Sequence, residues 1–244
     1  MDNAIKLAAN MLKKSRKAVA LTGAGVSTES GIPDFRSADG LWSRFDPFEY
    51  GTLGAFQRNP PKVWEMLKEL LSLVDCRPNR GHEAMARLEE MGILQGIITQ
   101  NIDGLHQKAG SRHVIEFHGS MASFSCPGCG AKKLLGEVRQ MEAPPQCPVC
   151  RLILKPNVVF FDEQIPPQAL RETEKLLRGA DLLLVAGTSC AVMPASFIPT
   201  QVLSQGGALI EINLAPVLAG IARVSLAGKF TEEMSAIVDQ MTES

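Results

Sequence analysis

The apolar positions of this chain fall into two patterns that alternate along its length. Short, nearly continuous apolar runs are separated by longer segments in which apolar residues recur every three or four positions. The first pattern is typical of strands buried on both faces, and the second of helices with one buried face. We predict strands at residues 18–21, 96–99, 114–117, 182–186, 208–212 and 224–226.

Helices are predicted between and beside these strands. They are expected at residues 4–14, 61–74, 82–91, 168–178, 195–203 and 231–240. Buried strands that alternate with helices are what a parallel sheet covered on both faces requires. The predicted fold class is therefore α/β, a doubly wound Rossmann-like parallel sheet built from both ends of the chain.

Residues 119–156 interrupt this alternation. The stretch holds four of the six cysteines together with several prolines and glycines, and it shows little periodicity. It is too short to bury a core of its own. We therefore predict a large domain from residues 1–118 and 157–244, with a small module at residues 119–156 inserted into it.

The composition excludes several classes of protein. The 244 residues include 25 Lys and Arg against 26 Asp and Glu, which gives a formal net charge of −1. Because 45% of the residues are hydrophobic, the chain can bury a large core, and disorder is excluded. The balanced charge argues against a protein that coats nucleic acid or an anionic membrane. We therefore expect no direct nucleic-acid binding and no membrane binding.

Two stretches resemble targeting or membrane segments without having the full pattern. Residues 1–17 lack the apolar core of a secretory signal, and a mitochondrial leader is the weaker interpretation of the same stretch. Residues 182–210 carry no charge, but Pro194, Pro199 and Gly206 interrupt them. These breaks favour a strand, a helix and a second strand over a membrane helix. We expect a cytoplasmic protein with reduced thiols.

Four cysteines form two pairs with the spacing of a zinc site. Cys126 and Cys129 enclose two residues, as do Cys147 and Cys150, and seventeen residues separate the pairs. This spacing lets four thiolates surround one tetrahedral ion, and four protein ligands leave no position for a substrate. We predict one structural zinc ion whose binding contributes to folding of the small module. Two redox-active pairs, or a zinc ribbon that contacts nucleic acid, are the alternatives.

A glycine-containing loop follows the first predicted strand. Gly23 and Gly25 permit a tight turn and a close approach of the backbone to a phosphate group. Thr28 stands where the dinucleotide-binding pattern G-x-G-x-x-G has its third glycine, and no P-loop lysine follows. The loop therefore favours phosphate binding over a purely structural turn, but it gives little support to a hydride-transfer enzyme.

Polar residues also gather after other predicted strands. Residues 99–106 include the end of the second strand, His118 follows the third, and residues 187–189 follow the fourth. The carboxyl ends of parallel strands lie at one edge of the sheet, where α/β proteins bind ligands. We therefore expect a single crevice at this edge, with residues 28–37 beside it.

These segments contain short motifs whose order along the chain is specific. They read GAGVS at residues 23–27, GIPDFR at 31–36, TQNID at 99–103, HG at 118–119, GTS at 187–189 and EIN at 211–213. With these motifs and its four paired cysteines, the chain resembles the sirtuins, a family of NAD-dependent protein-lysine deacylases. The resemblance implies NAD, consumed as a co-substrate, and one structural zinc ion. It also implies a cofactor loop and a helical segment at about residues 31–80 of an NAD-binding domain.

The resemblance further implies which positions contact NAD. Ser27 would help to hold the pyrophosphate, Phe35 would shield the reacting ribose, and Asn101 and Asp103 would position the ribose and the carboxamide. The whole implied set is Gly23, Ala24, Gly25, Ser27, Thr28, Asp34, Phe35, Arg36, Trp42, Gln100, Asn101, Ile102, Asp103, Gly187, Thr188, Ser189, Asn213 and Leu214.

By the same resemblance, His118 is the general base, and Asn101 is the second catalytic residue. The chemistry requires a group with a pKa near neutrality that accepts a proton from a ribose hydroxyl. A histidine at a strand end is otherwise more often structural. The remaining histidines, His82, His106 and His113, keep that structural interpretation.

The peptide substrate is expected along residues 158–163, where an extended backbone can pair with an added strand. The substrate-binding positions implied by the resemblance are Ile102, Val159, Phe161, Asp162 and Glu163. Val159 and Phe161 would line a tunnel for the lysine stem, although they also fit an ordinary buried strand. Asp162 stands where the family commonly has glycine, so it would place an added negative charge beside the peptide.

Two leucines indicate which kind of acyl group the enzyme would remove. Sirtuins that remove succinyl groups use a Tyr-x-x-Arg pair in the helix after the cofactor loop, and here Leu67 and Leu70 stand at the corresponding positions. Burial of a carboxylate without a basic partner costs several kcal/mol. We therefore expect neutral acyl groups to be preferred over succinyl.

Together these observations predict an enzyme, an NAD-dependent protein deacetylase. It would transfer the acyl group of acylated lysine peptides to ADP-ribose and release nicotinamide and O-acetyl-ADP-ribose. A catalytically idle NAD- or ADP-ribose-binding module and a mono-ADP-ribosyltransferase are the alternatives. The joint presence of His118, Asn101 and Asp103 disfavours the idle module.

Overall fold

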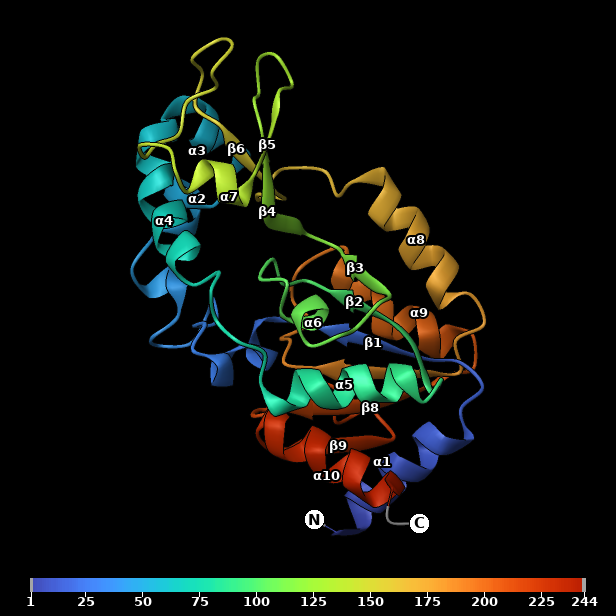
Figure 1. Ribbon diagram of the computed structural model, residues 1–244. Coiled ribbons are helices and arrows are strands. Elements are labelled where there is room, and N and C mark those ends of the chain that lie inside the picture. The colour runs from blue at the N-terminus through green and yellow to red at the C-terminus, as the bar shows by residue number, and fades with distance from the viewer. Residues whose placement is uncertain (1, 243–244) are drawn as a thin grey trace.

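The large sheet has six parallel strands, as the sequence pattern predicts. The computed structural model describes residues 2–242, and its ribbon is drawn in Figure 1. Strand order across the sheet is β3-β2-β1-β7-β8-β9, and every neighbouring pair is parallel. The strands are β1 (Ala18–Thr22), β2 (Leu94–Thr99), β3 (Val114–Glu116), β7 (Leu182–Ala186), β8 (Ala208–Asn213) and β9 (Val224–Ala227).

Helices cover both faces of this sheet (Figure 1). Ala18 and Ala20 of β1 pack into one core cluster with α1, α5 and α10. Val19 and Leu21 belong to the opposite cluster with α8 and α9, because successive side chains of a strand point to opposite faces. These helices are α1 (Asp2–Lys14), α5 (Arg80–Glu90), α8 (Pro167–Leu177), α9 (Ile198–Ser204) and α10 (Phe230–Thr242).

The order in which strands are added to the sheet reverses at β1, although all six strands run in the same direction. From β1 the sheet grows through β2 and β3 on one side, and through β7, β8 and β9 on the other. Such a point separates the loops that leave the carboxyl ends of the two central strands, and ligands of open α/β sheets bind in the resulting crevice. The topology therefore places a crevice beside the glycine loop after β1.

A second sheet is small and antiparallel, with the order β5-β4-β6. It lies at the top of Figure 1 together with the helices of the segment that follows the glycine loop. Trp64 joins the two, because its ring stacks on Phe124 and its Nε1–H donates to the carbonyl of Leu154 at 2.9 Å. The elements are α2 (Pro47–Tyr50), α3 (Leu53–Arg58), α4 (Pro60–Ser72), β4 (Gly119–Ser125), β5 (Lys132–Leu134), α7 (Leu135–Val138) and β6 (Lys155–Val158).

The expected extended segment at residues 158–163 is only partly right. Strand β6 ends at Val158, and beyond it the backbone turns, with a positive φ of 65° at Asp162. The sequence pattern also gave no signal for the four-residue helix α6 (Leu105–Lys108) or for three-residue 3₁₀ turns such as Ala24–Val26. Elements of this length are too short to show a helical period.

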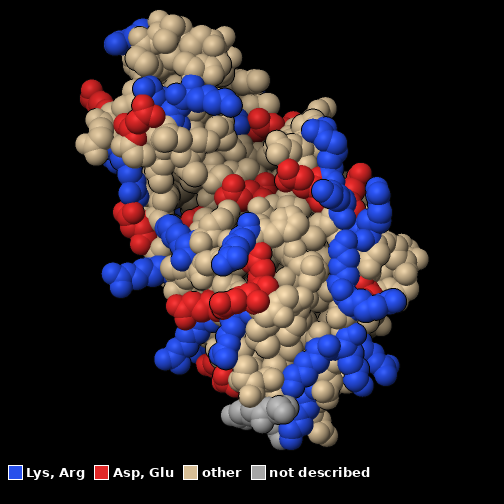
Figure 2. Space-filling view, turned by 45° about the vertical axis from the view of Figure 1, so that its right-hand side comes forward, with Lys and Arg blue, Asp and Glu red and all other residues tan. Residues whose placement is uncertain are grey.

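The uncharged stretch at residues 182–210 contains β7, a 3₁₀ turn at Ala195–Phe197, α9 and the start of β8. Within residues 2–242, no helix has the length and apolar character needed to cross a membrane. On the face drawn in Figure 2, carboxylates lie across the middle and a column of lysine and arginine side chains follows the right-hand side. That face therefore carries both signs of charge.

Candidate functional site

A cavity of about 560 Å³ opens at the carboxyl ends of β1, β2, β7 and β8. Its size lies in the range of small-molecule and cofactor sites. The predicted site residues that line it are Gly23, Ala24, Gly25, Thr28, Asp34, Phe35, Arg36, Trp42, Gln100, Asn101, Ile102, His118, Val159, Phe161, Asp162, Glu163, Gly187, Thr188, Ser189, Asn213 and Leu214. Ser27 and Asp103 line a smaller adjoining pocket instead.

The two glycines after β1 allow two strand-end loops to pack against each other. The N–H of Gly25 donates to the carbonyl of Gly187 at 2.9 Å. A Cβ atom at Gly23 would lie 2.8 Å from the Thr188 Cβ, and one at Gly25 would lie 2.8 Å from the Gly187 Cα. Any larger side chain would separate the loops. The glycines therefore serve the contact between the β1 and β7 loops as well as the shape of the cavity.

Asn101 is fixed beneath the cavity by hydrogen bonds. Its Nδ2 group donates to the Gly23 carbonyl at 3.2 Å and to Ser27 Oγ at 3.1 Å. Ser27 in turn donates to Asp103 Oδ2 at 2.7 Å, and the other oxygen of Asp103 accepts the N–H of Leu105. This chain of bonds connects the loops after β1 and β2 and accounts for the position of Ser27 and Asp103 outside the main cavity.

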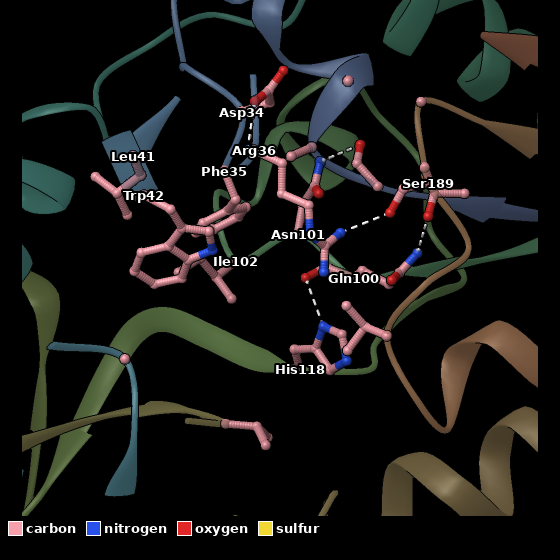
Figure 3. A pocket seen from close by; sticks show the side chains of 18 of the residues that line it. Asp34, Phe35, Arg36, Leu41, Trp42, Gln100, Asn101, Ile102, His118 and Ser189 are labelled. Atoms are coloured by element: carbon pink, nitrogen blue, oxygen red, sulfur yellow. Dashed lines mark hydrogen bonds between the residues drawn. The ribbon is translucent and has the colours of Figure 1, made fainter. Parts of the chain in front are cut away.

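His118 lies at the base of the cavity, below Gln100 in Figure 3. Its Nδ1 atom is 3.2 Å from the Gln100 carbonyl oxygen. Since a carbonyl only accepts, Nδ1 carries the hydrogen in this contact, and in the neutral ring Nε2 is the proton acceptor. Burial lowers the pKa of His118 below its ordinary value of about 6.5, an effect that the Gln100 carbonyl opposes. The imidazole is therefore neutral and able to accept a proton at pH 7.

Two other histidines form a buried pair outside the lining of this cavity. The rings of His82 and His106 have centroids 4.8 Å apart, and His106 Nε2 lies 2.9 Å from Thr22 Oγ1. Burial lowers the pKa of His82 to about 4. Burial and the neighbouring His82 lower the pKa of His106 to about 3. Both rings are therefore neutral at pH 7, and His106 contacts Thr22 at the end of β1, next to the glycine loop.

Phe35 and Trp42 form an aromatic wall on one side of the cavity, and the Arg36 side chain extends between this wall and Ser189, as Figure 3 shows. The rings of Phe35 and Trp42 have centroids 5.4 Å apart, and Trp42 lies 5.9 Å from Phe161. Arg36 Nη1 donates to Ser189 Oγ at 2.7 Å and so connects the cofactor loop to the loop after β7. Asp34 accepts the backbone N–H of Arg36 at 2.9 Å, which shapes this turn.

The loops after β7 and β8 are held by one threonine and one buried glutamate. Gln100 Nε2 donates to Thr188 Oγ1 at 3.0 Å, and Asn213 Nδ2 donates to the Thr188 carbonyl at 2.9 Å. Glu211 is 1% exposed, and its carboxylate accepts the N–H groups of Val217 and Leu218. Glu211 thereby fixes the segment after β8 that lines the cavity mouth.

Part of the cavity wall is apolar, and Met66, Val158 and Phe160 in this wall were not predicted as site residues. Helix α4 contributes Met66, Leu67 and Leu70 to this wall, Val158 lies at the end of β6, and Phe160 follows two residues later. The helical period of residues 61–74 predicts a buried face, but the same pattern serves a helix that packs only on protein. Sequence resemblance had singled out Leu67 and Leu70, and both border the cavity.

The segment after β6 is held on both sides by backbone hydrogen bonds. The N–H of Val159 donates to the His118 carbonyl at 2.8 Å, and the N–H of Phe161 donates to the Gly51 carbonyl at 2.8 Å. Lys155 Nζ lies 2.9 Å from Glu163 Oε2, which also accepts the N–H of Phe160. Strand β6 itself is an edge strand, since it pairs only with β4 in the small sheet.

The four paired cysteines meet at the far end of the small sheet. Their Sγ atoms all lie within 4.8 Å of one another. The separations of 3.3 Å for Cys126 and Cys150, and 3.5 Å for Cys129 and Cys147, are too long for disulfides of about 2.05 Å. A tetrahedral zinc ion with Zn–S bonds of about 2.3 Å separates its ligands by about 3.8 Å. The cluster therefore fits one structural zinc ion.

Comparisons with known proteins agree with this geometry. Residues 23–194, more than half of the chain, match the sequence profile of the Sir2 family. An NAD-dependent protein deacylase of Aeropyrum pernix is 44% identical over 232 residues, which cover 93% of this chain and 94% of that protein. A Pyrococcus abyssi protein of the same name is 42% identical over 240 residues, 96% of each chain.

Solved structures show the same fold. A Sir2 homologue in complex with NAD has a TM-score of 0.91 and 41% identity, and the match covers 98% of this chain and 94% of that one. A Sir2 protein with a p53 peptide and NAD+ has a TM-score of 0.89 and 35% identity, with 98% and 99% covered. The cavity at the strand ends combines polar groups with an aromatic wall and fits NAD. The chain therefore belongs to the Sir2 family, the sirtuins.

Proposed function

We propose that this protein is an NAD-dependent protein-lysine deacetylase that transfers the acyl group to ADP-ribose and releases nicotinamide and O-acetyl-ADP-ribose. The relatives from Aeropyrum pernix and Pyrococcus abyssi are named NAD-dependent protein deacylases. The observation that carries the proposal is the position of His118, where the polar strand-end loops meet the apolar wall of the same cavity. When bound, NAD supplies the ribose carbon that the acyl oxygen attacks as nicotinamide departs.

The strand-end loops would hold NAD. The loop after β1 faces the pyrophosphate, Thr188 and Asn213 bind the adenosine side, and Asn101 positions the nicotinamide ribose. The hydrogen bonds of Asn101 to Gly23 and Ser27 support this role, because they fix the amide before the ligand arrives. Phe35 and Trp42 cover the reacting ribose and exclude water.

His118 would act as the general base. Its Nε2 atom accepts a proton from a ribose hydroxyl, which then becomes the nucleophile toward the acyl carbon. The Gln100 carbonyl keeps the hydrogen on Nδ1, and the lowered pKa keeps the ring neutral at pH 7. His118 is therefore already neutral, with Nε2 free to accept the proton of the ribose hydroxyl.

The acylated peptide would add to the open edge of β6. Edge strands present unpaired backbone groups to which an extended peptide can bind, and β6 leads directly to Val159 and Phe161 at the cavity. Ile102, Asp162 and Glu163 border the same place. The acyl-lysine side chain would reach His118 from this side.

The acyl group would be neutral. Met66, Leu67 and Leu70 form an apolar wall, and no arginine or lysine other than Arg36 lines the cavity within residues 2–242. Arg36 is engaged by Ser189. A succinyl carboxylate would therefore lose its hydration without gaining a basic partner.

In this proposal the two domains have different roles. Residues 1–118 and 157–244 bind NAD, and residues 119–156 form the zinc-binding module that supports the peptide edge. A cytoplasmic location stays a prediction from the reduced cysteines.

The test is an assay with matched peptides. The protein is incubated with NAD and an acetyl-lysine peptide, and nicotinamide and O-acetyl-ADP-ribose are quantified. We expect both products only when peptide is present, and a rate for the succinyl peptide at least tenfold lower. Equal rates for the two peptides would contradict the acyl preference. Labelled protein instead of O-acetyl-ADP-ribose would indicate ADP-ribosyl transfer, and NAD binding without turnover would indicate an idle module.

A further inference from the structure

The turn after β6 carries two adjacent carboxylates that differ in their surroundings. Glu163 is compensated, because its carboxylate lies 2.9 Å from Lys155 Nζ and accepts the N–H of Phe160 at 3.0 Å. Asp162 lines the cavity and is exposed, and within residues 2–242 it forms no ion pair and accepts no hydrogen bond. The turn therefore presents one uncompensated negative charge.

The backbone holds Asp162 in a defined place. Its φ of 65° is in the left-handed region, which glycine, asparagine and aspartate adopt more readily than other residues. On one side of it, Phe161 exchanges backbone hydrogen bonds with Gly51 and Leu53. On the other, the N–H of Glu163 donates to the Phe160 carbonyl at 3.1 Å. These bonds hold the turn in the free protein.

We propose that Asp162 makes the enzyme prefer acyl-lysine segments that carry a lysine or arginine within a few residues of the acylated side chain. The inference rests on the proposed deacylase function, with the peptide added to the edge of β6. Successive residues of a strand rise by about 3.3 Å, so about three residues on either side of the acyl-lysine lie within the Debye length of about 10 Å at 0.1 M salt, and more of them at lower salt. A cation there is attracted by the free carboxylate, and a glutamate is repelled.

The expected effect is modest, because the charge is exposed to solvent. Exposed ion pairs of this kind change binding by about 1.4- to fivefold. Salt screens such interactions. The preference should therefore be largest at low ionic strength and should shrink as salt is added, which a purely steric preference would not do.

The test compares peptides within each variant, so that a general change in activity cancels. Two acetyl-lysine peptides of equal length carry either arginine or glutamate two residues from the acetyl-lysine, and an alanine-flanked peptide serves as reference. For each protein the ratio of kcat/KM for the arginine and glutamate peptides is measured at low and at high salt. The variants are Asp162→Asn, which keeps the shape and the left-handed backbone, and Asp162→Gly.

We expect both substitutions to lower the arginine-to-glutamate ratio by about two- to fivefold at low salt and to leave a smaller salt dependence. Glu90→Gln is the matched control, since Glu90 is an exposed carboxylate at the end of α5 outside the cavity lining. It should keep the wild-type ratio.

An unchanged ratio in Asp162→Asn, with the alanine-flanked peptide turned over by the wild-type protein, would overturn this inference alone. Absence of turnover of the alanine-flanked peptide by the wild-type protein would overturn the proposed function, and this inference with it. A ratio that falls in Asp162→Asn but does not respond to salt would also count against an electrostatic preference.

Discussion

The large sheet and the small sheet reach their stability in different ways. Strands of the large sheet are buried on both faces, so β7 has all five of its residues buried. The small sheet has short strands, and only β4 exceeds four residues. Its far end is held by four cysteines, and its near end by the contact of Trp64 with Phe124 and Leu154. The large sheet is stabilised by apolar burial, whereas the small sheet depends on a bound metal ion and on its contact with helix α4.

The proposed general base lies between these two regions. His118 follows β3 of the large sheet and directly precedes β4 of the small one. Its side chain contacts Gln100 after β2, and its carbonyl accepts the N–H of Val159 after β6. The position of His118 therefore depends on both sheets, so a change in either sheet should affect catalysis.

Removal of the metal should have the largest effect and should be confined to the small module. Metal binding contributes about 10 kcal/mol or more to the folding of small zinc domains. We expect Cys147→Ala, or treatment with a strong chelator, to unfold residues 119–156 and to abolish deacetylation. Hydrogen exchange should then show lost protection in β4 and β5 and retained protection in β1 and β7.

The control for this experiment is Cys76→Ala, which removes a cysteine outside the cluster. It should keep one zinc ion per chain and full protection of the small sheet. If the Cys147 variant lost protection equally in both sheets, the contrast between the two regions would be wrong.

Substitution of His118 should separate catalysis from folding. General-base catalysis contributes about 10²- to 10⁴-fold to rates, so His118→Ala should lower kcat by that factor while neither sheet unfolds. Calorimetric titration should show NAD affinity within a few-fold of the wild-type value. A coincident loss of Tm by more than about ten degrees would instead identify His118 as structural.

The pH dependence of stability should report on the large sheet. His82 and His106 have folded pKa values of about 4 and about 3, below the ordinary value of about 6.5. The unfolded chain therefore binds more protons as pH falls below 6.5, so their contribution is complete above pH 6.5 and is lost toward pH 4 and below. We expect each of the two histidines to account for a loss on the order of 3 kcal/mol in the free energy of unfolding between pH 7 and pH 4.

Urea unfolding at several pH values measures this effect, with zinc content followed in parallel. His106→Gln should give a shallower dependence on pH, because it removes one of the two buried imidazoles. A slope that is identical in the wild type and in His106→Gln would show that the buried pair does not govern acid stability.

The hydrophobic pattern located the long elements and the short strands β3 and β9 of the large sheet, but it missed the strands of the small sheet and the four-residue helices. The strand predicted at residues 182–186 is β7, and the helix predicted at residues 82–91 is α5 with ends shifted by one or two residues. Strand β4, with its mixed burial, and the four-residue helices gave no usable pattern. A period is visible only when an element spans several of its own repeats, and burial on one face must be regular.

The strand-end residues could be named in advance because their signals are local. Glycines, asparagines and a histidine after buried strands mark the edge where ligands bind, and the structure brings nearly all of them to one cavity. The apolar wall could not be named in this way. Met66 and Phe160 have the same sequence character as residues of an ordinary core, and only the tertiary arrangement of the cluster to which both belong places them on the cavity wall.

The sequence by itself determined the order of buried strands, the glycine loop, the four zinc ligands and the family, since each depends on residues close together or on fixed spacing. Tertiary structure alone decided that Ser27 binds Asp103 across 76 positions and that Trp64 anchors the small sheet through Leu154. These contacts join segments that are distant along the chain, and packing, not local propensity, selects among the many partners each side chain has available.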